Sequence, residues 1–382
     1  MTIAFLIKRI LVMLFTKNPF RIKPFVFFIE KKFGSAVDIP EDLSYILLKE
    51  TGKPFYYQSP HFFNLEACIE NFIGHVPRFK YKGLFKEPDR FAYSMSNAHV
   101  IGSIGLVYNS SLRSFVEESG KEWTKPLKQS VYLNMITPPP VKLLPGLTIS
   151  FLSNGADGGF YHFLFESLVK LDFYINLSNA DHYLFNGPST GWKLKWLDQT
   201  NIDQSKIIWV ENKSHFKCEQ LLFTNLLVND QQISSWTIQS IKKLIPKNNI
   251  GTKDSAKIIW LTRKGIKLRN ILWENQLLSS FPHITKVDFG SMDIRETLSI
   301  LQNATHIISP HGAALSNVFM CNEATHILEL YPDNETYKPC YARLSSVCKL
   351  KHNIAFINFT NEKHSKCGLD FLSRTISDFI TN

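Results

Sequence analysis

The second half of the chain alternates short apolar runs with stretches of helical periodicity, and this alternation limits the possible folds more than any other feature. Apolar runs of strand length occur at 258–261, 287–289, 306–309 and 327–330. Apolar residues at helical spacing fill the intervals at 271–280, 294–303 and 313–320. Short buried strands that alternate with helices form parallel sheets covered on both faces. The sequence therefore predicts an α/β domain built on a parallel sheet.

A weaker alternation of the same kind begins near residue 146. It predicts strands at 147–152, 183–185, 207–210 and 221–223, and helices at 161–175 and 234–244. A chain of 382 residues is too long for one ordinary core. Residues 246–251 combine turn formers with few apolar side chains, which is typical of a linker. We therefore expect an extension at 1–100 and two Rossmann-like domains, at 101–245 and 252–382, that face a central cleft.

The chain is basic, with a net charge of +10 and a pI near 9.1. Such a balance favours nucleic acid, an anionic membrane surface or phosphate-bearing substrates as partners. No nucleic-acid-binding motif is recognisable, so we expect no nucleic-acid partner. The phosphate loop of NTPases, the dinucleotide fingerprint and the nucleophile elbow of hydrolases are also missing.

The sequence contains no recognisable metal-binding motif. No two aspartates are separated by one residue, so the DxD cation site of many glycosyltransferases is missing. The six cysteines form no CxxC pair, which argues against a zinc site and favours free thiols in a reducing compartment. We therefore expect neither a bound metal nor a cofactor.

The start of the chain is apolar and then basic. Residues 3–15 are too few to span a bilayer and are interrupted by Lys8 and Arg9, and no cleavage site of a secretory signal follows. Five cations against one acidic residue come next, at 17–32. This pattern fits an interfacial helix on an anionic leaflet, and equally a helix that packs on the first domain. The expected location is the cytoplasm, with peripheral attachment to the inner face of the plasma membrane as the first alternative.

Several candidate binding residues follow the predicted strands of the second half, where ligands bind open parallel sheets. Arg263 and Arg269 come after the strand at 258–261, and arginine forks match phosphate oxygens. His311, Gly312 and Ala313 join a strand to a helix whose N-terminus favours anions. A further candidate, Glu329, is placed to accept hydrogen bonds from ribose hydroxyls. Each candidate also has a purely structural interpretation. The segment at His311 can be a tight turn, the two arginines can be solvent-exposed cations on a loop, and Glu329 can be a carboxylate paired with a cation.

In the first half, His162 and Glu166 follow two glycines and are spaced i and i+4, so they share one face of the predicted helix. A histidine titrates near neutral pH and suits a general base, and the carboxylate would orient it. The alternative is a pair that caps and packs the helix. A metal site would need a third ligand, which the pattern does not indicate.

Together these motifs resemble glycosyltransferase family 61, over roughly 147–332. The resemblance rests on five blocks in order: Tyr161–Glu166; Arg263, Arg269 and Glu274; Glu296; Pro310–Asn317, which reads PHGAALSN; and Glu329. Trp273 stands where the family usually has asparagine, and Thr297 where it has glutamine. The resemblance adds Glu274, Glu296 and Asn317 as supporting site residues.

The resemblance implies a GT-B fold, metal-independent transfer and inversion at the anomeric carbon. We expect the second domain to hold a nucleotide-diphosphate sugar, and the first to hold a glycan or lipid-linked glycan acceptor whose hydroxyl His162 deprotonates. Bacterial capsule or lipopolysaccharide synthesis is the expected pathway. The alternative is a non-catalytic scaffold or glycan-binding member of a polysaccharide-assembly complex, although such a protein has no use for a phosphate site.

Overall fold

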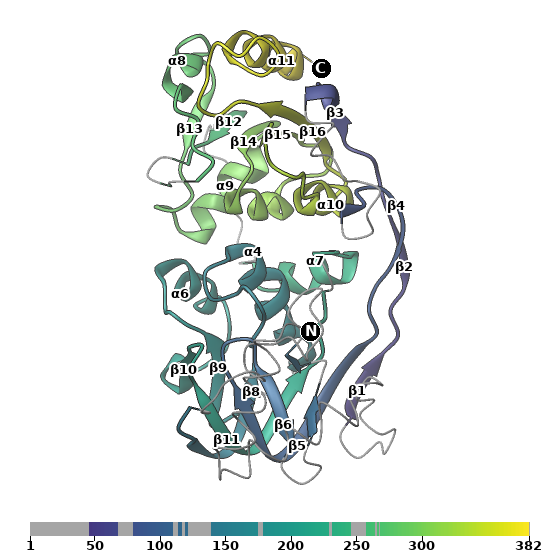
Figure 1. The fold of residues 1–382 in the computed structure, drawn as a ribbon, viewed down its shortest axis with the longest axis vertical. Coiled ribbons are helices and arrows are strands. Elements are labelled where there is room, and N and C mark those ends of the chain that lie inside the picture. The colour runs from purple at the N-terminus through teal and green to yellow at the C-terminus, as the bar shows by residue number, and fades with distance from the viewer. Residues whose placement is uncertain are drawn as a thin grey trace, which may run out of the picture. The chain divides into compact units, whose positions relative to one another are not determined.

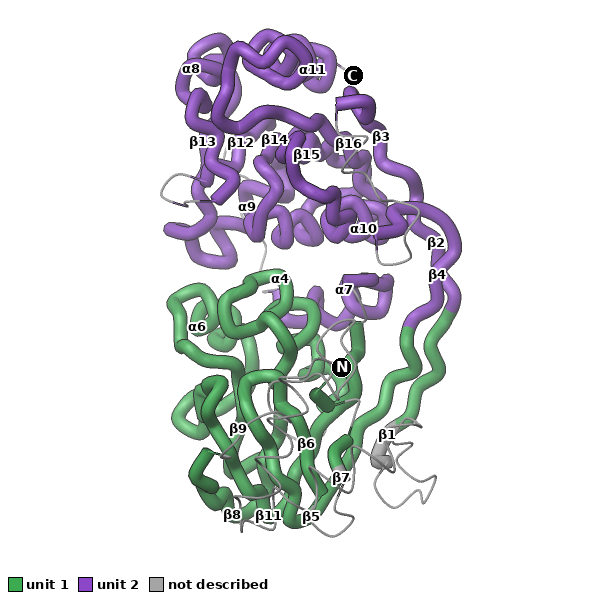
Figure 2. Tube along the Cα trace, in the orientation of Figure 1, with its two compact units in different colours: residues 1–53, 88–230 green, residues 54–87, 231–382 purple. Residues whose placement is uncertain are grey.

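The computed structural model describes residues 46–67, 79–109, 114–116, 119–120, 139–174, 179–228, 231–245, 257–263, 266 and 268–381. The chain divides into two compact units, which Figure 2 colours separately. Unit 1 comprises 1–53 and 88–230, and unit 2 comprises 54–87 and 231–382. The fold is mixed α/β with parallel strands in both units, which confirms that part of the prediction. The predicted N-terminal helix and the predicted linker at 246–251 lie outside the described residues.

In its described part, unit 1 is built on an eight-stranded sheet. The strand order is β10 (Ile207–Val210), β9 (His182–Asn186), β8 (Lys142–Ser150), β11 (His215–Thr224), β5 (Arg90–Ile101), β6 (Leu106–Asn109) and β7 (Ser114–Val116), with β1 (Ile46–Glu50) also on β5. The first four strands are parallel and lie in the chain order 3-2-1-4. The remaining strands pair antiparallel. The parallel half therefore has a topological switch point between β8 and β11.

The predicted helix at 161–175 is a helical run of changing pitch. It passes through α4 (Phe160–His162), a π-helical turn η8 (Phe163–Ser167), the short 3-10 turn η9 (Leu168–Lys170) and α5 (Leu171–Tyr174). Short π-helical segments are often found at functional sites. Farther along the chain, α6 (Gly191–Leu197) and η10 (Gln204–Lys206) complete the described helices of unit 1.

The described part of unit 2 contains a six-stranded sheet that is parallel throughout. Its order is β13 (Thr285–Val287), β12 (Ile258–Leu261), β14 (His306–Pro310), β15 (His326–Pro332), β16 (Lys351–Ile357) and β3 (His61–Phe62). Without β3, the chain order is 2-1-3-4-5, the flavodoxin-like arrangement, whose switch point lies between the first and third strands. In this unit these are β12 and β14.

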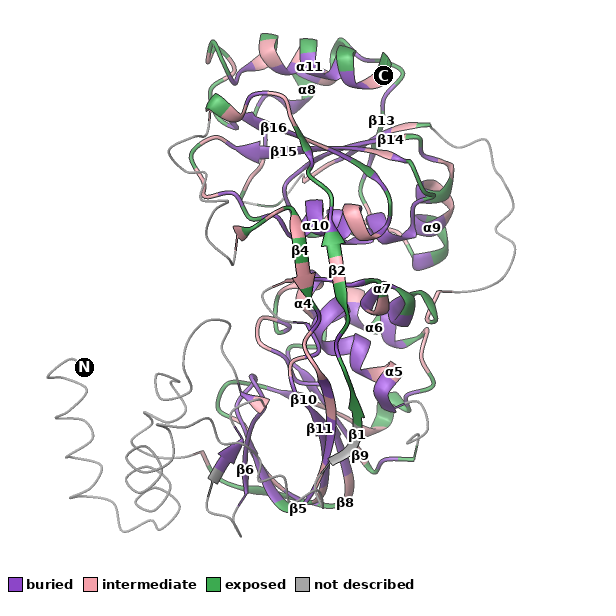
Figure 3. Ribbon diagram, turned by 90° about the vertical axis from the view of Figure 1, so that its right-hand side faces the viewer, coloured by how far each residue is buried: buried purple, intermediate pink, exposed green. Residues whose placement is uncertain are grey.

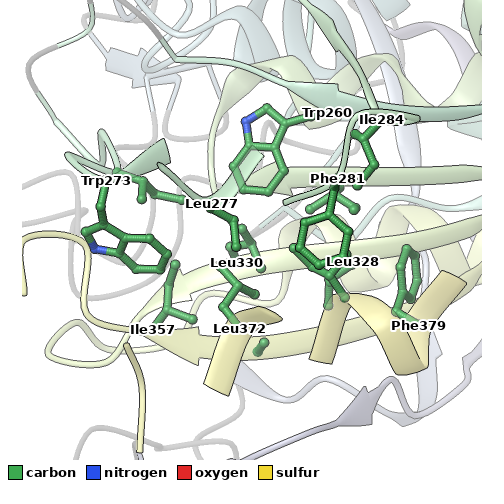
Figure 4. Close-up of a cluster of buried hydrophobic side chains, with 14 of the residues drawn as sticks. Trp260, Trp273, Leu277, Phe281, Ile284, Leu328, Leu330, Ile357, Leu372 and Phe379 are labelled. Atoms are coloured by element: carbon green, nitrogen blue, oxygen red, sulfur yellow. The ribbon is translucent and has the colours of Figure 1, made fainter. Parts of the chain in front are cut away.

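Helices cover both faces of the sheet of unit 2 (Figures 1 and 3). The described helices of unit 2 are α7 (Ser235–Lys242), α8 (Glu274–Ser279), α9 (Ile294–Asn303), the 3-10 helix η11 (Ala313–Met320), α10 (Cys340–Val347) and α11 (Leu369–Thr381). α8 and α11 pack on one face, where Trp260, Leu277, Leu328 and Leu372 belong to one buried cluster (Figure 4). This packing agrees with the coverage of both faces that a parallel sheet requires.

Residues 54–87 belong to unit 2, whereas the sequence suggested an extension over the first domain. The strands β2 (Pro54–Tyr57) and β4 (Gly83–Lys86) form a two-stranded antiparallel sheet. The buried Arg343 holds the chain beside it and donates to the carbonyl of Lys80 at 3.1 and 2.6 Å. Its guanidinium lies over the ring of Phe85, and the Tyr57 hydroxyl donates to the carbonyl of Ile233 at 2.6 Å.

The observed division therefore differs from the predicted boundaries at 100 and 245. Strand β5 lies inside the first sheet, paired with β11, and α7 belongs to the second unit. These pairings join residues more than a hundred positions apart, so local periodicity gives no sign of them.

The described residues contain no helix that is long and apolar enough to cross a membrane. Five cysteines are free and buried: Cys218, Cys321, Cys340, Cys348 and Cys367. The sixth, Cys68, lies outside the described residues.

The packing of α11 yields a test of the core of unit 2. Leu372 is fully buried between α11 and the sheet, so Leu372→Ala should leave a cavity and lower the free energy of unfolding by about 2–5 kcal/mol. Urea denaturation followed by tryptophan fluorescence measures this, since Trp260 and Trp273 lie in the same cluster. Leu369→Ala, at a half-buried position on the same helix, should cost less. Equal losses would show that α11 does not pack as described.

Candidate functional site

Arg263 and Gly312 meet at the switch point of unit 2. Arg263 follows β12, Gly312 follows β14, and these two strands are neighbours in the sheet. A Cβ atom at Gly312 would lie 1.6 Å from Nη1 of Arg263, so the guanidinium rests directly on the glycine backbone. The φ of Gly312 is 169°, an extended value that any residue adopts. A side chain at this position would therefore not strain the backbone, but it would displace the guanidinium of Arg263.

The guanidinium of Arg263 is also tied to its own loop. It donates from Nε and Nη2 to the carbonyl of Leu268, at 3.3 and 3.1 Å. Burial lowers the pKa of Arg263, with a further contribution from the nearby charge of Arg269. Arginine nevertheless stays charged in proteins, so a fixed cation lies beside the start of η11. The first N–H groups of such a helix lack intrahelical acceptors and favour an anion.

Arg269 forms a pair that the sequence did not suggest. Its Nε lies 3.1 and 3.0 Å from the two carboxylate oxygens of Glu335, which follows β15. Burial alone would lower the pKa of Arg269, but the hydrogen bonds and charge of Glu335 raise it. The charge of Arg269 also acts on Arg263, so the two arginines together make this region positive. The carboxylate of Glu335 neutralises part of the charge of Arg269.

Glu329 lies on the predicted strand, and its side chain has the partners of the predicted alternative, a paired carboxylate. Its side chain is fully buried in β15, and Oε1 contacts Nδ1 of His311 while Oε2 lies 3.0 Å from Nε2 of His352. Both oxygens are therefore engaged within the core, which does not fit the predicted contact with ribose. Burial alone would raise the pKa of Glu329, but the two histidines lower it to about 2. Glu329 therefore orients His311.

The three supporting residues have structural partners. Glu274 is buried at the start of α8, with Oε1 2.6 Å from Nζ of Lys286. Glu296 forms a capping box with Asp293 at the start of α9. Asn317 donates to the carbonyl of Ala314, within η11. They hold the helices around the site, and only η11 begins at the site itself, with Ala313 exposed at its first position.

In unit 1, His162 and Glu166 are paired as predicted from their spacing. Nδ1 of His162 lies 3.0 Å from Oε1 of Glu166, and the side chain of Glu166 is buried. Burial alone would lower the pKa of His162, but the charge and hydrogen bond of Glu166, together with Asp157, raise it. Such a pair can accept a proton and stabilise the resulting imidazolium.

Two buried lysines that sequence reasoning missed support this pair. Lys170 continues the i, i+4 row from Glu166 and donates to the carbonyl of Leu152, and burial lowers its pKa to about 7. The ammonium of Lys193 donates to the carbonyls of Asp157, Asn186 and Pro188 at 2.9, 2.7 and 3.0 Å. The i, i+4, i+8 spacing of His162, Glu166 and Lys170 is visible in the sequence and could have identified Lys170. Nothing local signalled Lys193, which fixes the loop before His162.

Among the described residues, no cluster of three or more histidine, cysteine, aspartate or glutamate side chains could hold a metal ion. The candidate site residues fall into two sets, one in each unit. The first contains His162, Glu166 and Lys170. The second contains Arg263, the start of η11, and His311 with Glu329.

Comparisons with known proteins place part of the chain in a family. Residues 160–328 match the model of the family described as glycosyltransferase 61. Among solved structures, the chain is similar to the bacterial iron-containing dodecameric glycosyltransferase TibC from enterotoxigenic E. coli H10407, at 11% identity and a TM-score of 0.27, over 68% of this chain and 71% of that chain. No curated protein sequence matches the chain. The matching segment, which contains both His162 and His311, therefore belongs to the glycosyltransferase 61 family, and the chain is a glycosyltransferase.

Proposed function

We propose that this glycosyltransferase binds the diphosphate of a nucleotide-sugar donor at the switch point of unit 2. One observation carries the proposal: the guanidinium of Arg263 is seated on Gly312 at the start of η11. An arginine fork and a helix N-terminus both favour phosphate oxygens, and both lie at the carboxyl ends of β12 and β14. There they would stabilise the negative charge that develops on the leaving diphosphate.

The acceptor chemistry is assigned to unit 1. His162 removes the proton from the acceptor hydroxyl, whose oxygen forms the new bond to the anomeric carbon as the bond to the diphosphate breaks. A single displacement of this kind inverts the anomeric configuration. The carboxylate of Glu166 supports this assignment, because it raises the pKa of His162 and stabilises its protonated form.

The wider proposal follows the family resemblance. The two units serve as the two Rossmann-like domains of a GT-B enzyme, a view supported by their parallel strand orders 3-2-1-4 and 2-1-3-4-5. A glycan or lipid-linked glycan of bacterial capsule or lipopolysaccharide is the proposed acceptor. The basic, apolar residues 1–32 would hold the enzyme on an anionic leaflet on the cytoplasmic side.

A thermal-shift screen tests the donor class. UDP-, GDP- and CMP-linked sugars are each added to the wild type and to Arg263→Ala, since a binder raises the melting temperature according to its concentration over Kd. A nucleotide-diphosphate sugar should stabilise the wild type and not the variant. Stabilisation by CMP sugars alone, or equal stabilisation of both proteins, would contradict the proposed diphosphate site.

The contact between Arg263 and Gly312 predicts non-additive mutations. Arg263→Ala should lower kcat/KM by roughly 100- to 1000-fold, with partial rescue by lysine. Gly312→Ala should also lower it by at least about 10-fold, because the new methyl group displaces the guanidinium. In the Arg263→Ala background, Gly312→Ala should then add little. Gly191→Ala, where a Cβ meets no atom within 4 Å, is the matched control. If the two substitutions lowered kcat/KM additively, Gly312 would not act through its contact with Arg263.

The His162–Glu166 pair predicts the acidic side of the pH profile. His162 must be neutral to accept a proton, so kcat/KM should rise with pH through the pKa of His162, which lies above its usual 6.5. In Glu166→Gln the carboxylate that raises this pKa is gone and burial still lowers it, so the acidic limb should move to lower pH. The kcat/KM profile of the free enzyme reports both values. An unmoved limb would show that another group is the base.

Metal independence is a separate prediction. The sequence has no DxD motif, and Arg263 can neutralise the diphosphate in place of a divalent cation. Transfer should therefore continue in excess EDTA at an unchanged rate. Loss of activity that Mn²⁺ or Mg²⁺ restores would require a cation at the donor site.

A further inference from the structure

A row of buried polar side chains continues behind His311, away from the turn that carries it. From His311 the row passes to Glu329 on β15, then to His352 on β16, and ends at Ser345 on α10. The distances are 3.0 Å between Glu329 Oε2 and His352 Nε2, and 2.8 Å between His352 Nδ1 and Ser345 Oγ. All four residues are buried. Three of them lie beyond the segment that matches the family, which ends at 328.

The chemistry of the groups fixes the hydrogens that face Glu329. An ionised carboxylate only accepts hydrogen bonds, so the nitrogens that face Glu329 both carry a hydrogen. His352 therefore donates from Nε2, and its Nδ1 lies 2.8 Å from the Ser345 hydroxyl, which can donate or accept. His311 donates from Nδ1, which leaves its Nε2 as the nitrogen not used by the row. The tautomer of His311 is thus set by Glu329.

The row also fixes where Glu329 points. With His352 on Oε2 and His311 on Oε1, the carboxylate has little freedom to rotate. The ring of His311 is further confined by Tyr331 and Tyr341, at centroid distances of 4.5 and 5.1 Å. Removing His352 would leave one oxygen of a fully buried carboxylate unpaired, which is costly and would favour rotation or protonation of Glu329.

Stability alone gives little reason for such a row. Replacing buried ionic groups by well-packed apolar residues is often neutral or stabilising. The neighbouring buried positions of these strands, such as Ile307, Leu328 and Ile354, are apolar. The end of the row at His311 adjoins Gly312, on which the guanidinium of Arg263 rests.

We propose that His352 and Ser345 are positioning residues of the donor site, which act through Glu329 to hold His311 in one orientation, with Nδ1–H on Glu329 and Nε2 toward the donor diphosphate. The neutral ring can only accept at Nε2, so it takes up a proton from solvent when the diphosphate binds and then donates from Nε2, and the carboxylate of Glu329 stabilises this cation. This inference rests on the proposed function, because it assigns the free nitrogen of His311 to that ligand. Histidines oriented by a carboxylate behave similarly in metal sites, where loss of the orienting partner typically costs about 10- to 100-fold in affinity or activity.

The test compares four variants of the full chain: His352→Leu, His352→Gln, Ser345→Ala and Leu372→Ala. UDP and GDP are the probes, and Kd is measured by calorimetry. His352→Leu should raise Kd about 10- to 100-fold. His352→Gln should restore much of the affinity, because its amide can still donate to Glu329. Leu372→Ala loses stability on the other face of the sheet and should bind as the wild type does.

A second readout observes His311 without any ligand. Nitrogen-15 NMR of the imidazole rings should show His311 protonated at Nδ1 in the wild type and in His352→Gln. A different or mixed tautomer is expected in His352→Leu. If the leucine variant does not fold, Ser345→Ala carries the test, since it keeps both histidines and removes the hydroxyl that holds the ring of His352 in place. A smaller rise in Kd with altered His352 and His311 signals is then expected.

The outcomes separate the two proposals. A wild type that binds UDP or GDP, with unchanged Kd and unchanged His311 signals in folded His352→Leu or Ser345→Ala, would overturn this inference alone. A wild type that binds neither nucleotide would overturn the proposed donor site, and the donor role of the row with it. Equal loss of affinity in Leu372→Ala would show that the row supports the fold and not the site.

Discussion

The buried charge of Glu329 is the constraint on which the candidate donor site depends. A carboxylate without exposure to water is tolerated only when its oxygens are paired. The centre of a parallel sheet offers few polar partners, because its backbone groups bond to neighbouring strands. The partners must therefore come from side chains on adjacent elements, here His311 from one side and His352 from the other. This need ties the turn before η11 to the core of the sheet.

Unit 1 also contains a buried carboxylate, Glu166, which has different partners. Glu166 is buried between His162, one turn before it, and Lys170, one turn after it. The pKa values of His162 and His311 nevertheless shift in opposite directions. Glu166 and Asp157 raise the pKa of His162, whereas deeper burial and the nearby Arg269 lower the pKa of His311. A histidine with a raised pKa holds an accepted proton better, and one with a lowered pKa stays neutral until an anion approaches.

Local patterns in the sequence predicted much of unit 2. β12, α9 and the extent of η11 agree with the apolar periodicity, because each is set by its own residues. The predicted strand at 287–289 forms two residues earlier, as β13, and β16, α10 and α11 were not predicted. β3 joins the sheet through a pairing with β16 across nearly three hundred residues, which no local period reveals.

The candidate site divides in the same way. The i, i+4 spacing of His162 and Glu166 and the small residues around Gly312 were visible in the sequence. The pairs of Arg269 with Glu335 and of Glu329 with His352 were not, because each joins residues from separate strands or loops. A carboxylate at the end of a strand suggested a ligand contact, but the direction of its side chain depends on the pleat and on its neighbours.

The strand orders explain why chemistry gathers at these particular turns. In unit 1 the first parallel strand is β8, and it lies beside the fourth, β11, at the switch point. In unit 2 the first strand is β12, and it lies beside the third, β14. At a switch point the connections leave in opposite directions, so the space above the strand ends is not covered by a crossover. The turns after β8 and β12 lead to His162 and Arg263. His162 is held by Glu166 of the same helical run, and Arg263 by its own loop and by the backbone at Gly312. Topology thus selects the position, and buried pairing fixes the orientation.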